Sequence, residues 1–189
     1  MNERAKTILD LWFIQTSQEE KFSNNKTFDK KIRDNFLDDY QKAIKNEYDY
    51  WHDNAAECLA LIILLDQFSR NLFRNNSEAF AMDNKARLVA NHAIDKGYCE
   101  KLTNDQLIFI FLPFMHSEEL KDQIYCGKLI DTYLKNHKSY KEAKKFYKLH
   151  HDIINEFGRF PYRNKVLGRK NTTKEKEYLK STRHDFFNI

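Results

Sequence analysis

Residues Cys58–Arg74 read CLALIILLDQFSRNLFR, in which eight apolar residues lead without a break into a polar half. A run of this length without Gly or Pro predicts a helix, and a helix that is apolar on every face is a buried one. The polar half therefore begins where the chain enters the interior. Successive residues of a helix lie about 100° apart, so five polar side chains share one arc: Asp66, Gln67, Arg70, Asn71 and Arg74.

Two charges of this arc are spaced as a helical ion pair. Asp66 precedes Arg70 by four residues, with the acid first, which is the favourable order on a helix. Buried charges are costly unless they are paired, so the two side chains are expected to contact each other. The pair is either a device that fixes the register of packed helices or part of a binding site.

The composition supports a helical domain with a substantial core. The chain has 189 residues, of which 41% are hydrophobic and 14% aromatic, and only four Gly and two Pro. So few turn formers favour long helices over an all-β fold. The mean hydropathy of −0.78 reflects a charged surface rather than disorder, because the apolar fraction is ample. We predict one domain spanning residues 1–189.

The apolar spacing predicts an all-α fold of about eight helices packed as antiparallel hairpins. No β-branched cluster alternates as a strand would. Capping boxes are predicted at Thr103, Ser139 and Thr172, and helix stops at Gly97 and Gly158. Pro113 is expected to end or kink its helix. The expected helices cover residues 3–13, 28–44 (capped by Asn25 or Thr27), 55–74 (capped by Asp53 or Asn54), 77–96, 105–111, 118–136 (capped by Ser117), 140–157 and a short one from 173.

The cysteines and apolar runs point to the cytoplasm. Cys58, Cys99 and Cys126 are odd in number and form no CxxC motif, so they predict neither a disulfide framework nor a zinc site. The first residues lack a signal-peptide pattern. The longest apolar runs are too short to cross a bilayer, so no membrane contact is expected.

Two further polar clusters lie beside apolar segments. One is His116-Ser117-Glu118, which follows LPFM. The other begins at His150 and continues through the segment FGRFPYRN, residues 157–164, to Leu167-Gly168-Arg169. A closing clasp of the fold would also explain this last segment, since Gly158 permits a reversal and Pro161 stiffens it.

These segments together resemble a known bacterial family, the domain of unknown function 924. The matching pieces are LDLWF (9–13), LLDQFSRNLFR (64–74), FAMD (80–83), LPFMHSE (112–118), Gln123, His150, FGRFPYRN (157–164) and LGR (167–169). The resemblance covers nearly the whole chain. It implies an all-helical fold similar to tetratricopeptide repeats, and it implies no activity. Tyr162 stands where the family pattern usually has His.

A functional reading places the polar clusters around one pocket. Its carboxylates and imidazoles suit acid–base chemistry, and its guanidinium groups suit an anion. The spacing matches no metal motif such as HExxH, so we expect no metal and no cofactor. A triad built on Ser117 and His116 is disfavoured because Ser117 is expected to cap a helix. The candidate ligand-binding residues are Asp66, Gln67, Arg70, Asn71, His116, Glu118, His150, Arg159 and Arg163.

Three functions fit this reading. The first is a binding module that holds a peptide or a small anionic ligand. The second is a hydrolase or transferase that uses His116, Glu118 or His150 as acid or base, although no established catalytic motif is present. The third is RNA or DNA binding through residues 159–183, which carry nine Lys or Arg against two Glu. Nucleic acid ranks last, because the rest of the chain is nearly neutral.

Overall fold

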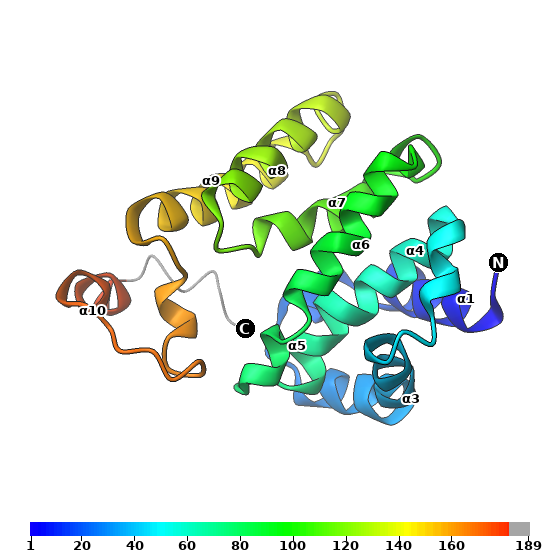
Figure 1. The fold of residues 1–189 in the computed structure, drawn as a ribbon, viewed down its shortest axis with the longest axis horizontal. Coiled ribbons are helices and arrows are strands. Elements are labelled where there is room, and N and C mark those ends of the chain that lie inside the picture. The colour runs from blue at the N-terminus through cyan, green and yellow to red at the C-terminus, as the bar shows by residue number, and fades with distance from the viewer. Residues whose placement is uncertain (182–189) are drawn as a thin grey trace.

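Helices form every regular element in the part of the chain that the computed structural model describes, residues 1–181, and no strand occurs there. This confirms the predicted all-α class. Figure 1 shows helices that succeed one another as neighbours, while the tetratricopeptide-like pairing stays a prediction. The α-helices are α1 (Glu3–Asp10), α2 (Gln18–Phe22), α3 (Lys26–Ile44), α4 (Ala55–Ile62), α5 (Ser69–Leu72), α6 (Asp83–Asp95), α7 (Asn104–Met115), α8 (Leu120–Tyr133), α9 (Tyr140–Phe157) and α10 (Thr173–Lys180).

The centre of the core is α4 together with the π-helical turn Ile63–Phe68 that continues it. Every residue from Cys58 to Asn71 is buried, as the apolar run predicted. Helices α1, α6 and α7 pack against α4, and α3 packs against the π turn. The central helix is therefore enclosed on several sides, which is the situation that favours a helix apolar all round.

The C-terminal helices extend this body. Helix α8 packs against both α7 and α9. A second, smaller apolar cluster, Ile153, Ile154 and Phe160, lies apart from the main core. Figure 1 shows that α10 and the segment before it stand beside the end of α9 rather than over α4.

Most of the predicted helix ends are found. Asn25 caps α3 and Asn54 caps α4, each by accepting two backbone N–H bonds. The capping boxes at Thr103 and Thr172 are both formed. Gly97 and Gly158 follow α6 and α9 at φ +68° and +66°, the left-handed conformation in which a side chain is strained.

Three predicted helix ends were wrong. Helix α7 runs through Pro113 to Met115, because the surrounding turns are buried and this packing outweighs one lost backbone hydrogen bond. Ser139 has ψ near 0° rather than the extended backbone of a cap, so its predicted capping box is not formed. Residues Ser77–Phe80 form a 3₁₀ turn, and α6 begins only at Asp83.

The region around Ser117 also differs from the expectation. Helix α8 begins at Leu120, three residues after Ser117. The Ser117 hydroxyl still accepts the Glu119 N–H at 3.2 Å, and it donates to Asp122 at 2.6 Å. It therefore stabilises a turn, and the predicted cap was wrong, because the N-cap residue of α8 is Glu119.

Candidate functional site

A π-helical turn places the central carboxylate of the site. The sequence predicted one regular helix from residue 55 to 74, but residues Ile63–Phe68 form a wider turn between α4 and α5. Such turns hold one extra residue per turn and are frequent at functional sites. Asp66 and Gln67 lie in this turn, and the Asp66 side chain has no solvent exposure.

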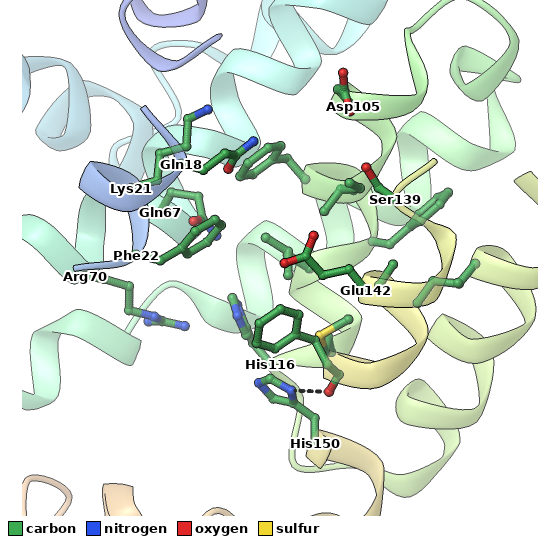
Figure 2. A pocket seen from close by; sticks show the side chains of 18 of the residues that line it. Gln18, Lys21, Phe22, Gln67, Arg70, Asp105, His116, Ser139, Glu142 and His150 are labelled. Carbon is green, nitrogen blue, oxygen red and sulfur yellow. Dashed lines mark hydrogen bonds between the residues drawn. The ribbon is translucent and has the colours of Figure 1, made fainter. Parts of the chain in front are cut away.

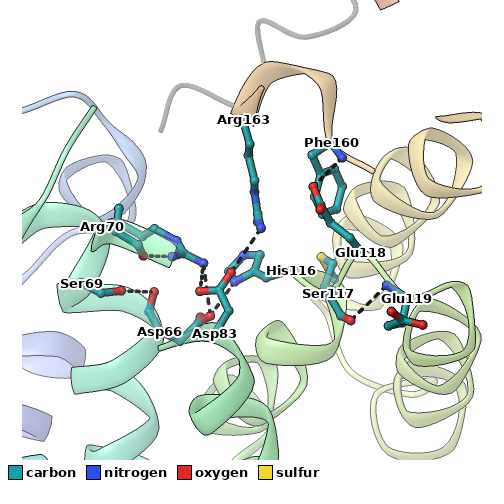
Figure 3. Close-up of polar contacts among 12 residues, drawn as sticks. Asp66, Ser69, Arg70, Asp83, His116, Ser117, Glu118, Glu119, Phe160 and Arg163 are labelled. Atoms are coloured by element: carbon teal, nitrogen blue, oxygen red, sulfur yellow. Dashed lines mark hydrogen bonds and ion pairs between the residues drawn. The ribbon is translucent and has the colours of Figure 1, made fainter. Parts of the chain in front are cut away.

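The buried Asp66 is held by three neighbours, of which His116 and Arg70 are labelled in Figure 3. His116 Nδ1 donates to its Oδ1 at 2.7 Å, and the Gln67 amide donates to its other oxygen. Arg70 Nη2 lies 3.7 Å from Oδ1. Burial opposes ionisation of Asp66, but the imidazole, the guanidinium and the amide outweigh it and hold the pKa of this carboxyl below its ordinary value.

The principal partner of Arg70 is another carboxylate. Arg70 Nη2 lies 2.6 Å from Asp83 Oδ1, at the start of α6, whereas the predicted contact with Asp66 is longer. Arg163 Nη1 reaches Asp83 Oδ2 at 3.2 Å (Figure 3). The two guanidinium groups also lie 4.6 and 4.5 Å from the centre of the Phe80 ring. One carboxylate therefore joins two cations that are 93 positions apart in the sequence.

The remaining members of the polar arc bind another helix. Asn71 Nδ2 donates to Asp29 at 2.8 Å, and the Arg74 guanidinium donates to both oxygens of Asp29 at 2.7 and 2.8 Å. Asp29 is in the first turn of α3. These bonds tie α3 to the end of α5, so part of the arc has a structural role.

His150 enters the site from α9. Its ring centre lies 6.1 Å from that of His116 and 5.6 Å from that of Phe160. Its Nδ1 bonds the Phe146 carbonyl oxygen at 2.8 Å, which requires a proton on Nδ1. Burial, His116 and Arg163 together lower the pKa of His150 to about 3, so this imidazole is neutral at physiological pH.

Two of the predicted site residues lie elsewhere. Glu118 accepts two bonds from Arg169, at 2.6 and 2.9 Å, and the Phe160 N–H at 2.8 Å. Arg159 donates to Glu175 of α10 at 2.6 and 2.8 Å. These bonds fasten residues 159–169 to their surroundings, so Glu118 and Arg159 have a structural role.

Beside the Asp66–His116 pair lies a pocket of about 660 Å³ (Figure 2). One end is polar and includes Gln67, Arg70, Asn71, His116 and His150. The walls are mainly apolar and come from α7, α8 and α9, with Phe22 and Lys21 contributed by α2. Four cationic and two acidic side chains line it: Lys21, Arg70, Arg74, Lys138, Asp105 and Glu142.

Sequence reasoning missed the residues that α2 brings to the pocket and, on α9, every lining residue except His150. Phe22 is 57% exposed, and Lys21 lies 5.6 to 5.9 Å from three aromatic ring centres. No local pattern marks them, because the pocket forms only when α2 comes to lie near α7 and α9. Asp83 had one signal, since it ends the FAMD segment that carried the family resemblance.

Four of the nine cations of the predicted basic surface form ion pairs within the chain. Arg159, Arg163, Arg169 and Lys174 each pair with a carboxylate of the same chain. Arg183, the last of the nine cations, lies outside the described residues. The charge available to a nucleic acid is therefore smaller than the sequence suggested.

Among residues 1–181, no group of three or more His, Cys, Asp or Glu side chains is arranged to hold a metal ion. The three cysteines are free and buried, and burial raises the pKa of Cys58 to about 12, which leaves a thiol of low reactivity. No helix in the same range is both long and apolar enough to cross a bilayer.

Comparison with known proteins identifies the family of this chain. The family model described as "Bacterial protein of unknown function (DUF924)" matches residues 8–183. The chain belongs to this family. Among solved structures, a protein of unknown function from Agrobacterium tumefaciens is 35% identical, with a TM-score of 0.81, over 93% of this chain and 96% of that one. The search of curated proteins found no match.

Proposed function

We propose that this chain binds a small organic anion, a carboxylate with an apolar body, in the pocket beside Asp66 and His116. The observation that carries the proposal is the composition of the pocket, which joins a buried polar end to apolar walls. A volume of about 660 Å³ lies within the roughly 300–1,000 Å³ of typical ligand sites, which are mostly apolar with a few placed polar groups. Arg70 and Arg74 pair with Asp83 and Asp29, so the lining cations without an ion pair among residues 1–181 are Lys21 and Lys138, and these favour an anion.

A small molecule fits this pocket better than a peptide does. The buried polar groups of the lining are few, namely Gln67, Arg70, Asn71 and His150, whereas its other polar side chains are exposed or half-buried. An extended peptide would need hydrogen-bonding partners for its backbone along its whole length. Apolar walls of Leu, Ile, Met and Phe offer none, and they suit a hydrocarbon or aromatic body.

The test is a binding series measured by calorimetry and by the shift in melting temperature. The ligands are straight-chain carboxylates of increasing length and the primary amides of the same chains. Each added methylene that enters the pocket should strengthen binding about four-fold, since its burial contributes about 0.8 kcal/mol. The carboxylates should bind more tightly than their amides.

Variants at the rim assign the binding to this pocket. Phe22→Ser removes an exposed lining ring and should weaken binding, whereas Ile14→Ser, at an exposed residue outside the lining, should not. Lys21→Gln should weaken the carboxylates more than the amides, with Lys31→Gln as the matched control. The proposal fails if no ligand of the series binds, or if Phe22→Ser and Ile14→Ser have equal effects.

A further inference from the structure

The Asp66–His116 pair has the geometry of an oriented general base. Asp66 is ionised and fully buried, so the hydrogen bond of 2.7 Å to His116 must be donated by the imidazole Nδ1–H. In a neutral imidazole the proton on Nδ1 leaves the lone pair on Nε2. A buried carboxylate that fixes the imidazole tautomer in this way also stabilises the imidazolium formed when Nε2 takes a proton.

The basic nitrogen is available to a ligand. His116 lines the pocket, whereas Asp66 lies behind the lining. No hydrogen bond to His116 Nε2 occurs among residues 1–181. The atom is also not fully buried, so it is open to solvent. The Nε2 atom therefore meets whatever occupies the polar end of the pocket.

Neighbouring groups favour His116 over His150 as the base. His150 is surrounded by His116, Arg163 and the Phe160 ring, and its Nδ1 donates to the Phe146 carbonyl oxygen rather than to a side-chain carboxylate. The other charged groups at this end are Arg70, Asp83 and Arg163, in which the two cations share one carboxylate. His116 Nδ1 is bonded to the Asp66 carboxylate, so His116 is the imidazole that is prepared to accept a proton on Nε2.

We propose that His116 acts as a general base in the hydrolysis of a carboxylic ester whose apolar acyl group occupies the pocket. The inference rests on the proposed function, since the carboxylate ligand is then the product of the reaction. Asp66 is the positioning residue that holds the tautomer of His116. The only co-reactant is water.

In the first step His116 Nε2 takes a proton from a water molecule while the water oxygen forms a bond to the ester carbonyl carbon. The carbonyl π electrons move to its oxygen and give a tetrahedral oxyanion. When the C=O bond re-forms, the bond to the alcohol oxygen breaks, and His116 returns its proton to that oxygen. The products are one carboxylic acid and one alcohol, and the imidazole is again neutral.

The experiment measures hydrolysis of nitrophenyl esters of the carboxylates that bind, with the full-length chain. General-base catalysis typically contributes about 10²–10⁴-fold, so His116→Gln should lower kcat/KM by at least about 100-fold. The matched control is His151→Gln on α9, which changes a histidine outside the pocket lining and should leave the rate unchanged. Hydrolysis that persists in His116→Gln, or that falls equally in both variants, overturns the inference.

Asp66→Asn separates positioning from a merely structural role. A neutral amide no longer stabilises the imidazolium, so the rising limb of the pH–rate profile should move to lower pH while kcat falls. An Asp66→Asn variant that folds and keeps the wild-type profile contradicts the role given to Asp66. If His116→Gln does not fold, carbethoxylation of the wild-type chain replaces it. Modification of His116, mapped by mass spectrometry, should abolish hydrolysis and should be slowed by a bound carboxylate; unchanged hydrolysis after modification overturns the inference.

Binding data distinguish the two proposals. If the carboxylates bind and their esters are not hydrolysed above the His116→Gln background, the catalytic inference is wrong and the binding proposal stands. If neither the carboxylates nor their esters engage the pocket, both are wrong.

Discussion

At the scale of single residues, the charges of the site are joined through Asp83. This carboxylate accepts from Arg70 at 2.6 Å and from Arg163 at 3.2 Å, and both guanidinium groups are buried. Arg163 Nε and Nη2 and Arg70 Nε have no hydrogen-bond partner among the described residues. These two cations therefore depend heavily on one anion.

We expect Asp83→Asn to be strongly destabilising. Removing one member of a buried ion network leaves uncompensated charge, which typically costs about 3–5 kcal/mol. The free energy of unfolding, measured in urea, should fall by about 3 kcal/mol. Asp34→Asn is the matched control, because Asp34 forms an exposed pair with Lys30, and such pairs contribute little. Equal losses in the two variants would refute the central role of Asp83.

The sequence indicated which polar residues could belong to the site, but it did not indicate most of the pairs that these residues form. Helical spacing identified Asp66 and Arg70 as neighbours, and they are 3.7 Å apart. It gave no information on Asp83 and His116, whose contacts with them are closer, because such partners depend on how α6 and α7 pack on the central helix. The prediction also joined Glu118 and Arg159 to the pocket, whereas each is bonded to a residue of the C-terminal segment.

At the scale of elements, local signals set the helix ends and packing overrides some of them. The caps at Asn25, Asn54, Thr103 and Thr172 follow from side-chain hydrogen bonds within one turn, which a sequence displays directly. The passage of α7 through Pro113 depends on burial, which a sequence displays only indirectly. The π turn at Ile63–Phe68 has no sequence signal that we can name, yet it determines where Asp66 points.

Glu175 holds α10 against the segment before it, and this contact should be sensitive to acid. The Arg159 guanidinium, with the Thr172 N–H and Asn164, lowers the pKa of Glu175 from 4.5 to about 2. A carboxyl whose folded pKa is depressed contributes stability above its unfolded pKa and loses it as the pH falls toward the folded value. The wild type should therefore exceed Glu175→Gln in stability most at pH 5 and above.

Urea unfolding of both chains between pH 6 and pH 3 measures this difference. The difference in the free energy of unfolding between the wild type and Glu175→Gln should decrease continuously as the pH falls below about 4.5. Glu177→Gln serves as the control, because Glu177 lies in the same helix, is exposed and makes none of these bonds. A gap that stays constant over this range would show that Glu175 does not titrate with folding.

Close packing of α8 on α9 depends on Gly127. A Cβ atom at this position would lie 2.6 Å from the Tyr147 ring of α9, so the ring would have to move. In a helix interior Ala is otherwise favoured over Gly by about 1 kcal/mol. We expect Gly127→Ala to give no gain, or a loss, in the wild-type chain.

The same substitution should behave differently once the ring is gone. In a Tyr147→Ala background, Gly127→Ala should stabilise the chain by about 1 kcal/mol, because only the helix propensity remains. The double-mutant cycle, measured by urea unfolding, reports the coupling between the two positions. If Gly127→Ala has the same effect in both backgrounds, the steric explanation is wrong.

At the scale of the whole molecule, the C-terminal segment, residues 159–180, is attached to the helical body through few contacts. Phe160 of this segment packs with Ile153 and Ile154 of α9 in a cluster that is separate from the main core. Two polar links bridge the gap, one from Arg163 to Asp83 and one from Arg169 and the Phe160 N–H to Glu118. Regions with few apolar contacts open more readily than the core around α4.

Hydrogen exchange should reveal this difference and the part that Glu118 plays in it. Arg169 and the Phe160 N–H hold the pKa of Glu118 below its ordinary value, so the carboxylate is ionised and bonded at neutral pH. In Glu118→Gln the charge-assisted bonds to Arg169 are lost, and we expect amides of residues 159–180 to exchange about ten-fold faster, corresponding to roughly 1.4 kcal/mol. Amides of α4 and α7 should be unaffected.

Glu119→Gln is the control for that measurement, because the neighbouring side chain is exposed and makes none of these bonds. If both variants accelerate exchange equally, the effect comes from the net charge of the loop rather than from the link. If Glu118→Gln accelerates exchange in α4 as well, the C-terminal segment and the core open together. The Arg163–Asp83 contact would then join them into one cooperative unit, and changes at the polar end of the pocket would be felt throughout the molecule.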